Sequence, residues 1–154
     1  MRTHKLVHSH KGFSLIELLI ACALLAILLA LALPNLVASK RAAREQTAKG
    51  KLAAIGAQET SFRTLLGKHR YGALSELQAT SAGGSPLLTA ADTSVPEWTF
   101  SDVGAATTTT FGVKVEPASG NPAGYSFVIF EDQAVRRCAR SGPWSKTDCA
   151  QINE

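Results

Sequence analysis

The sequence predicts an α+β fold, in which a long N-terminal α-helix, membrane-spanning in its first half, packs on a C-terminal antiparallel β-sheet. Two observations predict the helix: residues 13–33 form an apolar run, and apolar side chains then recur at helical spacing up to residue 66. The third observation concerns the chain after residue 108, where apolar and polar side chains alternate as in strands with one buried face.

The apolar run holds a single charged side chain, Glu17. At 1.5 Å per residue, a helix over residues 13–33 is about 30 Å long, which is the thickness of a bilayer core. A carboxylate in such a helix costs roughly 2.5–3.5 kcal/mol to insert, so we expect Glu17 to have a partner. Pro34 follows the run. Because proline lacks a backbone donor and clashes with the carbonyl four residues earlier, it is expected to bend or loosen the helix.

The start of the run has a distinctive order of residues: Gly12, Phe13, Ser14, Leu15, Ile16, Glu17, Leu18. This order resembles the class III leader of type IV prepilins and type II secretion pseudopilins, and the resemblance covers residues 11–66. It implies the pilin fold, cleavage after Gly12 by a membrane-embedded prepilin peptidase, and N-methylation of Phe13 by the same enzyme. It also implies that Glu17 attracts the N-terminus of a neighbouring subunit during assembly. Pro34 matches the family's proline at the end of the apolar segment.

The chain is expected to divide into five segments. These are a cleaved leader peptide (1–12), a transmembrane and assembly helix (13–34), the amphipathic half of the long helix (35–66), a variable αβ connecting region (67–108), and an antiparallel sheet with a C-terminal disulfide loop (109–154).

The resemblance further implies a structural subunit of a type IV pilus that serves motility, adhesion or DNA uptake. The implied partners are identical subunits in a helical filament, the prepilin peptidase and methyltransferase, the inner-membrane assembly machinery, and the membrane itself before assembly. Before assembly the N-terminus would be cytoplasmic and the C-terminal domain periplasmic, and the assembled pilus would be extracellular. Three basic residues, Arg2, Lys5 and Lys11, precede the apolar run and favour this orientation.

Other interpretations of the apolar run remain open. A type II secretion pseudopilin has the same kind of leader. An ordinary secretory signal, ahead of a periplasmic binding or adhesion module, would use the small residues Ala30 and Ala32 as its cleavage site. A lipoprotein signal would use Cys22. The leader pattern favours the prepilin because Glu17 is otherwise unexplained, and because a strongly apolar stretch follows Cys22. Cys22 is then expected to be a small buried apolar residue.

The second half of the helix is predicted to be amphipathic. Its apolar stripe is expected to pack on the sheet and consists of Leu52, Ile55, Phe62, Leu65 and Leu66. Glu45 and Lys49 are expected to pair. The basic run 40–51 is interpreted as a solvated or subunit-facing surface. The net charge of +4 includes three basic residues of the leader, so it does not indicate nucleic-acid binding.

The remaining elements are read from local patterns. A short helical turn is predicted over 71–77, with Leu74 and Leu77 facing inward. Residues 83–86 are predicted as a loop. A strand is predicted to begin at Trp98, and further strands are predicted over 109–116, 125–130, which would be central, and 134–140. The threonines at 107–110 are interpreted as the start of a strand, rather than as sites for O-linked sugar.

Cys138 and Cys149 lie eleven positions apart, in a part of the chain expected to face an oxidising compartment. A disulfide closing such a loop contributes roughly 2–3 kcal/mol, and two free thiols are the alternative. The resemblance also implies a C-terminal loop closed by a disulfide. The enclosed Trp144 is expected to be exposed.

The sequence does not predict an enzyme. It has no phosphate-binding loop, no paired-cysteine motif and no metal-ligand cluster. A calcium site near the C-terminal loop would need several oxygen ligands, and Glu131, Asp132 and Asp148 are too few and too scattered. No metal and no cofactor is therefore expected.

Overall fold

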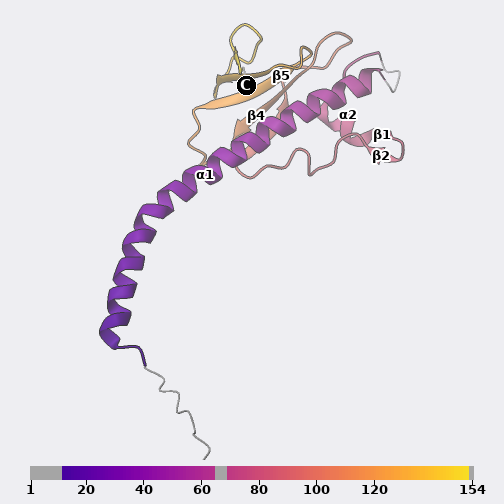
Figure 1. Cartoon of the computed structure of the whole chain (residues 1–154). Coiled ribbons are helices and arrows are strands. Elements are labelled where there is room, and N and C mark those ends of the chain that lie inside the picture. The colour runs from indigo at the N-terminus through magenta and orange to yellow at the C-terminus, as the bar shows by residue number, and fades with distance from the viewer. Residues whose placement is uncertain (1–11, 65–68, 153–154) are drawn as a thin grey trace, which may run out of the picture. The chain divides into compact units, whose positions relative to one another are not determined.

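The computed structural model describes residues 12–64 and 69–152 (Figure 1). It forms two compact units, Met1–Arg41 and Ala42–Glu154, which are considered separately. Along the chain the elements are α1 (Leu15–Thr64), α2 (Leu74–Ala79), β1 (Ser81–Ala82), β2 (Ser85–Pro86), β3 (Trp98–Asp102), β4 (Gly112–Pro117), β5 (Tyr125–Phe130), β6 (Val135–Ala139) and β7 (Ala150–Gln151). The predicted α+β class is confirmed.

The N-terminal unit consists of the first part of α1. The helix is continuous through Pro34, which leaves the carbonyl of Ala30 without its helical donor. Asn35 follows, and its Nδ2 donates to the Leu31 carbonyl at 3.4 Å. Among the described residues, α1 is long and apolar enough to span a membrane, by length and composition alone. Cys22 is exposed, so its predicted burial is wrong for the isolated chain. A lone helix offers a small side chain nothing to pack against.

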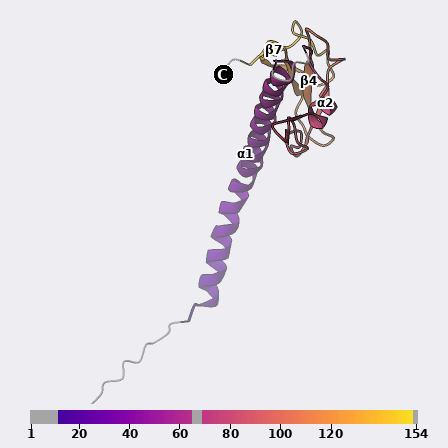
Figure 2. The same cartoon turned by 90° about the vertical axis from the view of Figure 1, so that its right-hand side faces the viewer.

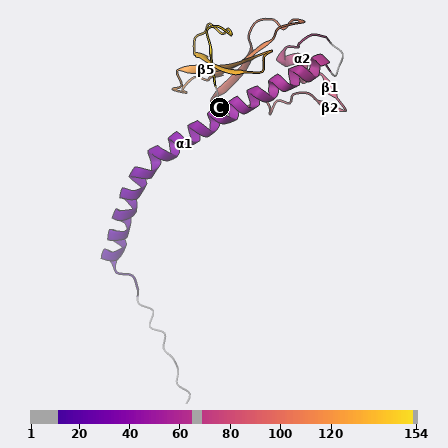
Figure 3. The same cartoon turned by 45° about the horizontal axis from the view of Figure 1, so that its top comes forward.

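The second part of α1 supplies one wall of the core. The side chains of Ala48, Leu52, Ile55, Glu59 and Phe62 are buried, at alternating spacings of four and three residues, as an amphipathic helix requires. In Figure 3 this part of the helix runs beside the sheet, and Figure 2 shows α2 and β4 close to its C-terminal end. The rest of the predicted stripe, Leu65 and Leu66, lies outside the described residues.

Gly56 allows close contact between α1 and the sheet. A Cβ atom at this position would lie 2.7 Å from Cδ1 of Ile129 on β5 and 2.5 Å from Oε1 of Gln133. Glycine lowers helix propensity by about 1 kcal/mol relative to alanine. The absence of a side chain at Gly56 lets α1 approach β5. This close packing could not be predicted from the low helix propensity of glycine.

The sheet is an antiparallel meander of five strands in the order β3-β4-β5-β6-β7, with β5 central as predicted. Alternate residues of β5 face opposite sides. Phe127 and Ile129 join the core beside α1, whereas Val128 and Phe130 join a smaller cluster with the two bonded cysteines. Burial on both faces explains why residues 125–130 form a nearly continuous apolar run. The strand β7, which pairs with Arg136 and Arg137 of β6, has no counterpart among the predicted elements.

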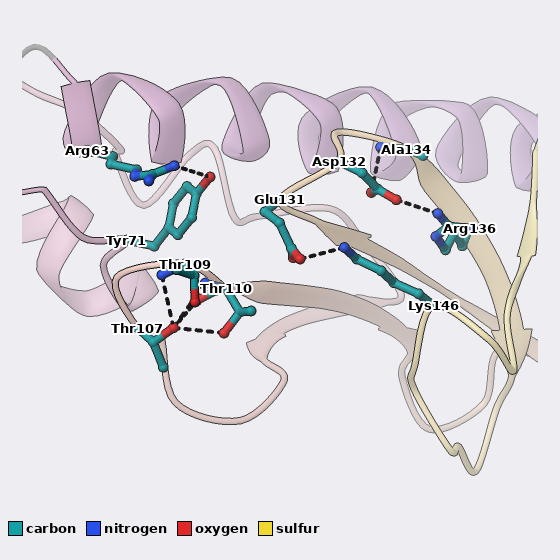
Figure 4. A network of polar contacts seen from close by, with 10 residues as sticks. All are labelled: Arg63, Tyr71, Thr107, Thr109, Thr110, Glu131, Asp132, Ala134, Arg136 and Lys146. Atoms are coloured by element: carbon teal, nitrogen blue, oxygen red, sulfur yellow. Dashed lines mark hydrogen bonds and ion pairs between the residues drawn. The ribbon is translucent and has the colours of Figure 1, made fainter.

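Two local predictions are corrected. The threonines at 107–110 do not begin a strand, because β4 starts at Gly112. Instead Thr107 Oγ1 accepts hydrogen bonds from the amides of Thr109 and Thr110, at 3.2 and 2.9 Å, and closes an exposed turn (Figure 4). The predicted loop 83–86 is partly a hairpin, in which β1 pairs with β2 around Gly83 and Gly84, both at positive φ.

The C-terminal loop is closed by a disulfide between Cys138 and Cys149. Trp144 within it is half-buried rather than exposed, which corrects the prediction. Its Nε1 donates to Ser126 Oγ at 2.9 Å, and Lys114 Nζ lies 3.4 Å from the centre of its ring. The loop therefore covers the face of the sheet that carries Val128 and Phe130.

Loss of this disulfide is expected to act locally before it acts globally. Replacing Cys138 and Cys149 by alanine should cost about 3 kcal/mol of unfolding free energy, because an eleven-residue loop is released. Hydrogen exchange should accelerate first in β7 and residues 139–148, while α1 and β4 keep their protection. Cys22→Ala is the matched control and should leave exchange in the C-terminal unit unchanged. Equal acceleration in β4 and β7 would contradict this expectation.

Candidate processing and assembly segment

The junction between Gly12 and Phe13 lies just before α1, in backbone without regular secondary structure. The Phe13 side chain is 78% exposed. A Cβ atom added at Gly12 would meet nothing within 4 Å, and its φ is not in the left-handed region. The fold therefore has no steric need for glycine at position 12.

Glu17 lies in the first turn of α1, where the helix dipole favours a negative charge. The turn is closed by a hydrogen bond from the Leu18 amide to the Ser14 carbonyl, at 3.1 Å. Glu17 is exposed, and within residues 12–64 and 69–152 it forms no ion pair. A carboxylate in an apolar helix needs compensation. The described part of the chain does not supply it.

The apolar half of α1 exposes large side chains on all of its faces. From Phe13 to Val37 these side chains are 48–78% exposed. A helix that is apolar all round is stable only when lipid or other helices cover it. This property, together with the position of Glu17, makes residues 12–37 the candidate site for processing and assembly.

The basic run that follows is engaged mainly by its own domain. Arg44 pairs with Glu97 at 2.5 Å, and Lys49 pairs with Glu45 at 3.1 Å as predicted. Lys51 Nζ donates to the carbonyls of Ala91 and Ser94. These contacts lie at the surface, so the interpretation of 40–51 as a solvated or subunit-facing surface stays a prediction. Long-range contacts to residues 91–97 hold Arg44 and Lys51, whereas Lys49 pairs with Glu45 within the helix.

Two of the three acidic residues considered for calcium are paired with cations. Glu131 accepts from Lys146 at 2.5 Å, and Asp132 accepts from Arg136 and from the Ala134 amide (Figure 4). In the part of the chain that the structure describes, no group of three or more His, Cys, Asp or Glu side chains is arranged to hold a metal ion. These carboxylates stabilise the turn after β5 and its link to the C-terminal loop.

A second cluster was not predicted from the sequence. The carboxylates of Glu59, Glu76 and Asp102 gather at the start of α2, where they accept hydrogen bonds from backbone amides. One signal was available, because Glu59 falls at a helical position between the apolar Ile55 and Phe62. A charged residue in an apolar stripe indicates a buried ionisable group.

Comparison with known proteins gives one finding. The profile of the prokaryotic N-terminal methylation motif matches residues 7–33, which include Gly12, Phe13 and Glu17. No curated protein and no solved structure matches the chain. The match ends one residue before Pro34, so it covers the junction and the apolar helix but not the C-terminal unit. The chain thus carries the prokaryotic N-terminal methylation motif, the class III signal peptide of type IV pilins, on a long apolar helix.

Proposed function

We propose that this chain is a structural subunit of a type IV pilus, made as a precursor and polymerised through the apolar half of α1. The observation that carries the proposal is the methylation motif at residues 7–33, at the head of a helix whose large apolar side chains are exposed. The motif supports a pilin-like or pseudopilin precursor. The motif does not distinguish a pilin from a pseudopilin, so the choice of a pilus rests on the disulfide and ion pairs of the C-terminal unit.

The proposed sequence of events uses the residues of the segment in turn. The precursor is held in the inner membrane by residues 13–34, with its N-terminus in the cytoplasm. Prepilin peptidase cleaves after Gly12 and methylates the new N-terminus at Phe13. Glu17 then attracts the ammonium group of Phe13 on a neighbouring subunit, and in a low-dielectric environment this attraction is much stronger than in water. Pro34 removes one helical hydrogen bond and so allows the helix to adjust as it packs into a filament.

Two features favour a pilus over a pseudopilus. The C-terminal region is closed by the Cys138–Cys149 disulfide, which needs no bound ion. The acidic residues nearest this loop, Glu131 and Asp132, are paired with Lys146 and Arg136, so a calcium ion would have to displace a cation from each. On this proposal the protein has a structural role and is itself the substrate of a peptidase.

Processing is tested by mass spectrometry of the mature N-terminus. We expect a chain that begins at methylated Phe13. Gly12→Val should block cleavage while leaving the C-terminal unit folded, because nothing lies within 4 Å of a Cβ at this position. A mature chain that begins at Leu33, or at a lipidated Cys22, would disprove the pilin assignment.

Assembly is tested by Glu17→Ala and by the isosteric Glu17→Gln. Both should leave export and cleavage largely intact, since Glu17 forms no ion pair in the described residues. Both should abolish filaments, because the attraction to the neighbouring ammonium is lost. Glu116→Gln, which removes an ion pair with Lys114 on the sheet, is the control and should still assemble. Normal filaments from Glu17→Gln would show that apolar packing alone drives assembly.

The choice between pilus and pseudopilus is tested by deletion. Loss of this chain should remove long extracellular filaments and leave the secretion of folded enzymes unchanged. Filaments from the intact strain should persist when calcium is chelated, because the disulfide closes the C-terminal loop. If deletion instead blocks enzyme secretion and spares surface filaments, the chain is a pseudopilin.

A further inference from the structure

Three consecutive backbone amides at the start of α2 each donate to a different carboxylate. Gly72 N donates to Glu59 on α1 at 3.0 Å, and Leu74 N donates to Asp102 on β3 at 3.2 Å. Between them, Ala73 N donates to Glu76 of α2 itself at 3.1 Å. Carboxylates from a helix, a strand and α2 therefore converge on one turn of backbone. This turn connects the long helix to the rest of the C-terminal unit.

Glu59 differs from the other two carboxylates in its burial. Its side chain is 0% exposed, and its Oε1 has no hydrogen-bond partner, whereas its Oε2 accepts from Gly72. The packing around Gly72 is tight. A Cβ atom there would lie 2.7 Å from Cδ1 of Leu77 and 3.1 Å from Cε1 of Phe62. One hydrogen bond is little compensation for a buried negative charge.

The charged groups around Glu59 do not favour its ionised form. Asp102 and Glu76 are negative and raise its pKa, and Arg70 is positive and lowers it. Arg70 is mainly committed to Glu76, with which it forms two hydrogen bonds of 2.8 and 2.5 Å. Burial is the largest effect, the Gly72 hydrogen bond opposes it, and together these influences raise the pKa of Glu59 from 4.5 to about 7.

We propose that Glu59 is a proton-dependent latch, which holds α2 and the preceding Gly72–Ala73 turn against α1 when its carboxyl group is neutral and loosens them when it ionises. The proton leaves to solvent water when the turn opens. Tyr71 remains the fixed point, because its hydroxyl accepts from Arg63 at 3.2 Å (Figure 4) and its ring packs against Phe111. The latch lies within residues 42–154, so it does not depend on pilus assembly.

The direction of the pH effect follows from proton linkage. Between pH 4.5 and about 7, the folded state holds a proton on Glu59 that the unfolded chain has released. The stabilising contribution is therefore complete below pH 4.5 and is lost as pH rises through about 7. The latch is therefore most stable in acidic surroundings and is fully loosened above about pH 7.

The experiment measures amide hydrogen-exchange protection in the full-length, disulfide-bonded chain in detergent micelles, from pH ~5 to ~9, corrected for intrinsic exchange rates. We expect protection of residues 72–79 to fall by up to about tenfold per pH unit from pH ~5 to about 7, and to level off above about pH 7. Peptides from β4 and β5 serve as internal references and should keep constant protection. Parallel loss of protection in β4 and β5 would overturn a local latch, and so would constant protection in residues 72–79.

Two variants separate the latch from other causes. Glu59→Gln keeps an acceptor for Gly72 but cannot ionise, so protection of 72–79 should become independent of pH. Asp102→Asn keeps an acceptor for Leu74 but removes a negative charge that raises the pKa of Glu59, so protection should level off at a lower pH. The same pH dependence in Glu59→Gln as in the unaltered chain would overturn the proposal. If Glu59→Gln does not fold, the chemical shift of the Gly72 amide proton is measured by NMR in the unaltered chain. It should titrate with a midpoint near pH 7, and a shift that does not titrate there would overturn the proposal.

Discussion

The structure depends on one constraint: the apolar half of α1 buries almost nothing against the described parts of its own chain. Large side chains from Phe13 to Val37 are about half exposed or more, and at about 25 cal/mol per Å² such surface strongly favours cover by lipid or other copies. Burial within the chain begins at Ala48, where α1 contributes to the core. The two halves of α1 thus differ: the large apolar side chains up to Val37 are exposed, and residues from Ala48 onward contribute to the core. The basic run 40–51 lies where the composition of the helix changes.

Much of the fold could be predicted because its signals are local. The spacing of Leu52, Ile55 and Phe62 identifies the buried face of α1, and the apolar run at 125–130 identifies the central strand. The features that were missed depend on contacts between distant residues. Trp144 is half-buried because Ser126 and Lys114 lie beside it, and β7 forms because β6 offers a free edge. No local pattern in residues 107–110 distinguishes a β-branched strand from a turn closed by its own hydroxyl groups.

The motif that contains the candidate processing and assembly residues could be recognised from the sequence because it is local. Gly12, Phe13 and Glu17 lie within six residues of one another, and the roles proposed for them concern other molecules rather than distant parts of the same chain. Packing among the described residues does not require glycine at position 12. The carboxylate cluster is the opposite case. Glu59, Glu76 and Asp102 are separated by up to 43 positions, and only the folded backbone brings them to one turn.

The two faces of the central strand β5 contribute to two separate hydrophobic clusters. Phe127 and Ile129 belong to the core that α1 requires, whereas Val128 and Phe130 belong to the cluster beneath the C-terminal loop. Because neighbouring residues of one strand serve separate regions, sequence change on one side need not disturb the other. A substitution in the C-terminal loop can therefore alter the cluster of Val128 and Phe130 while the packing of Phe127 and Ile129 beside α1 is retained.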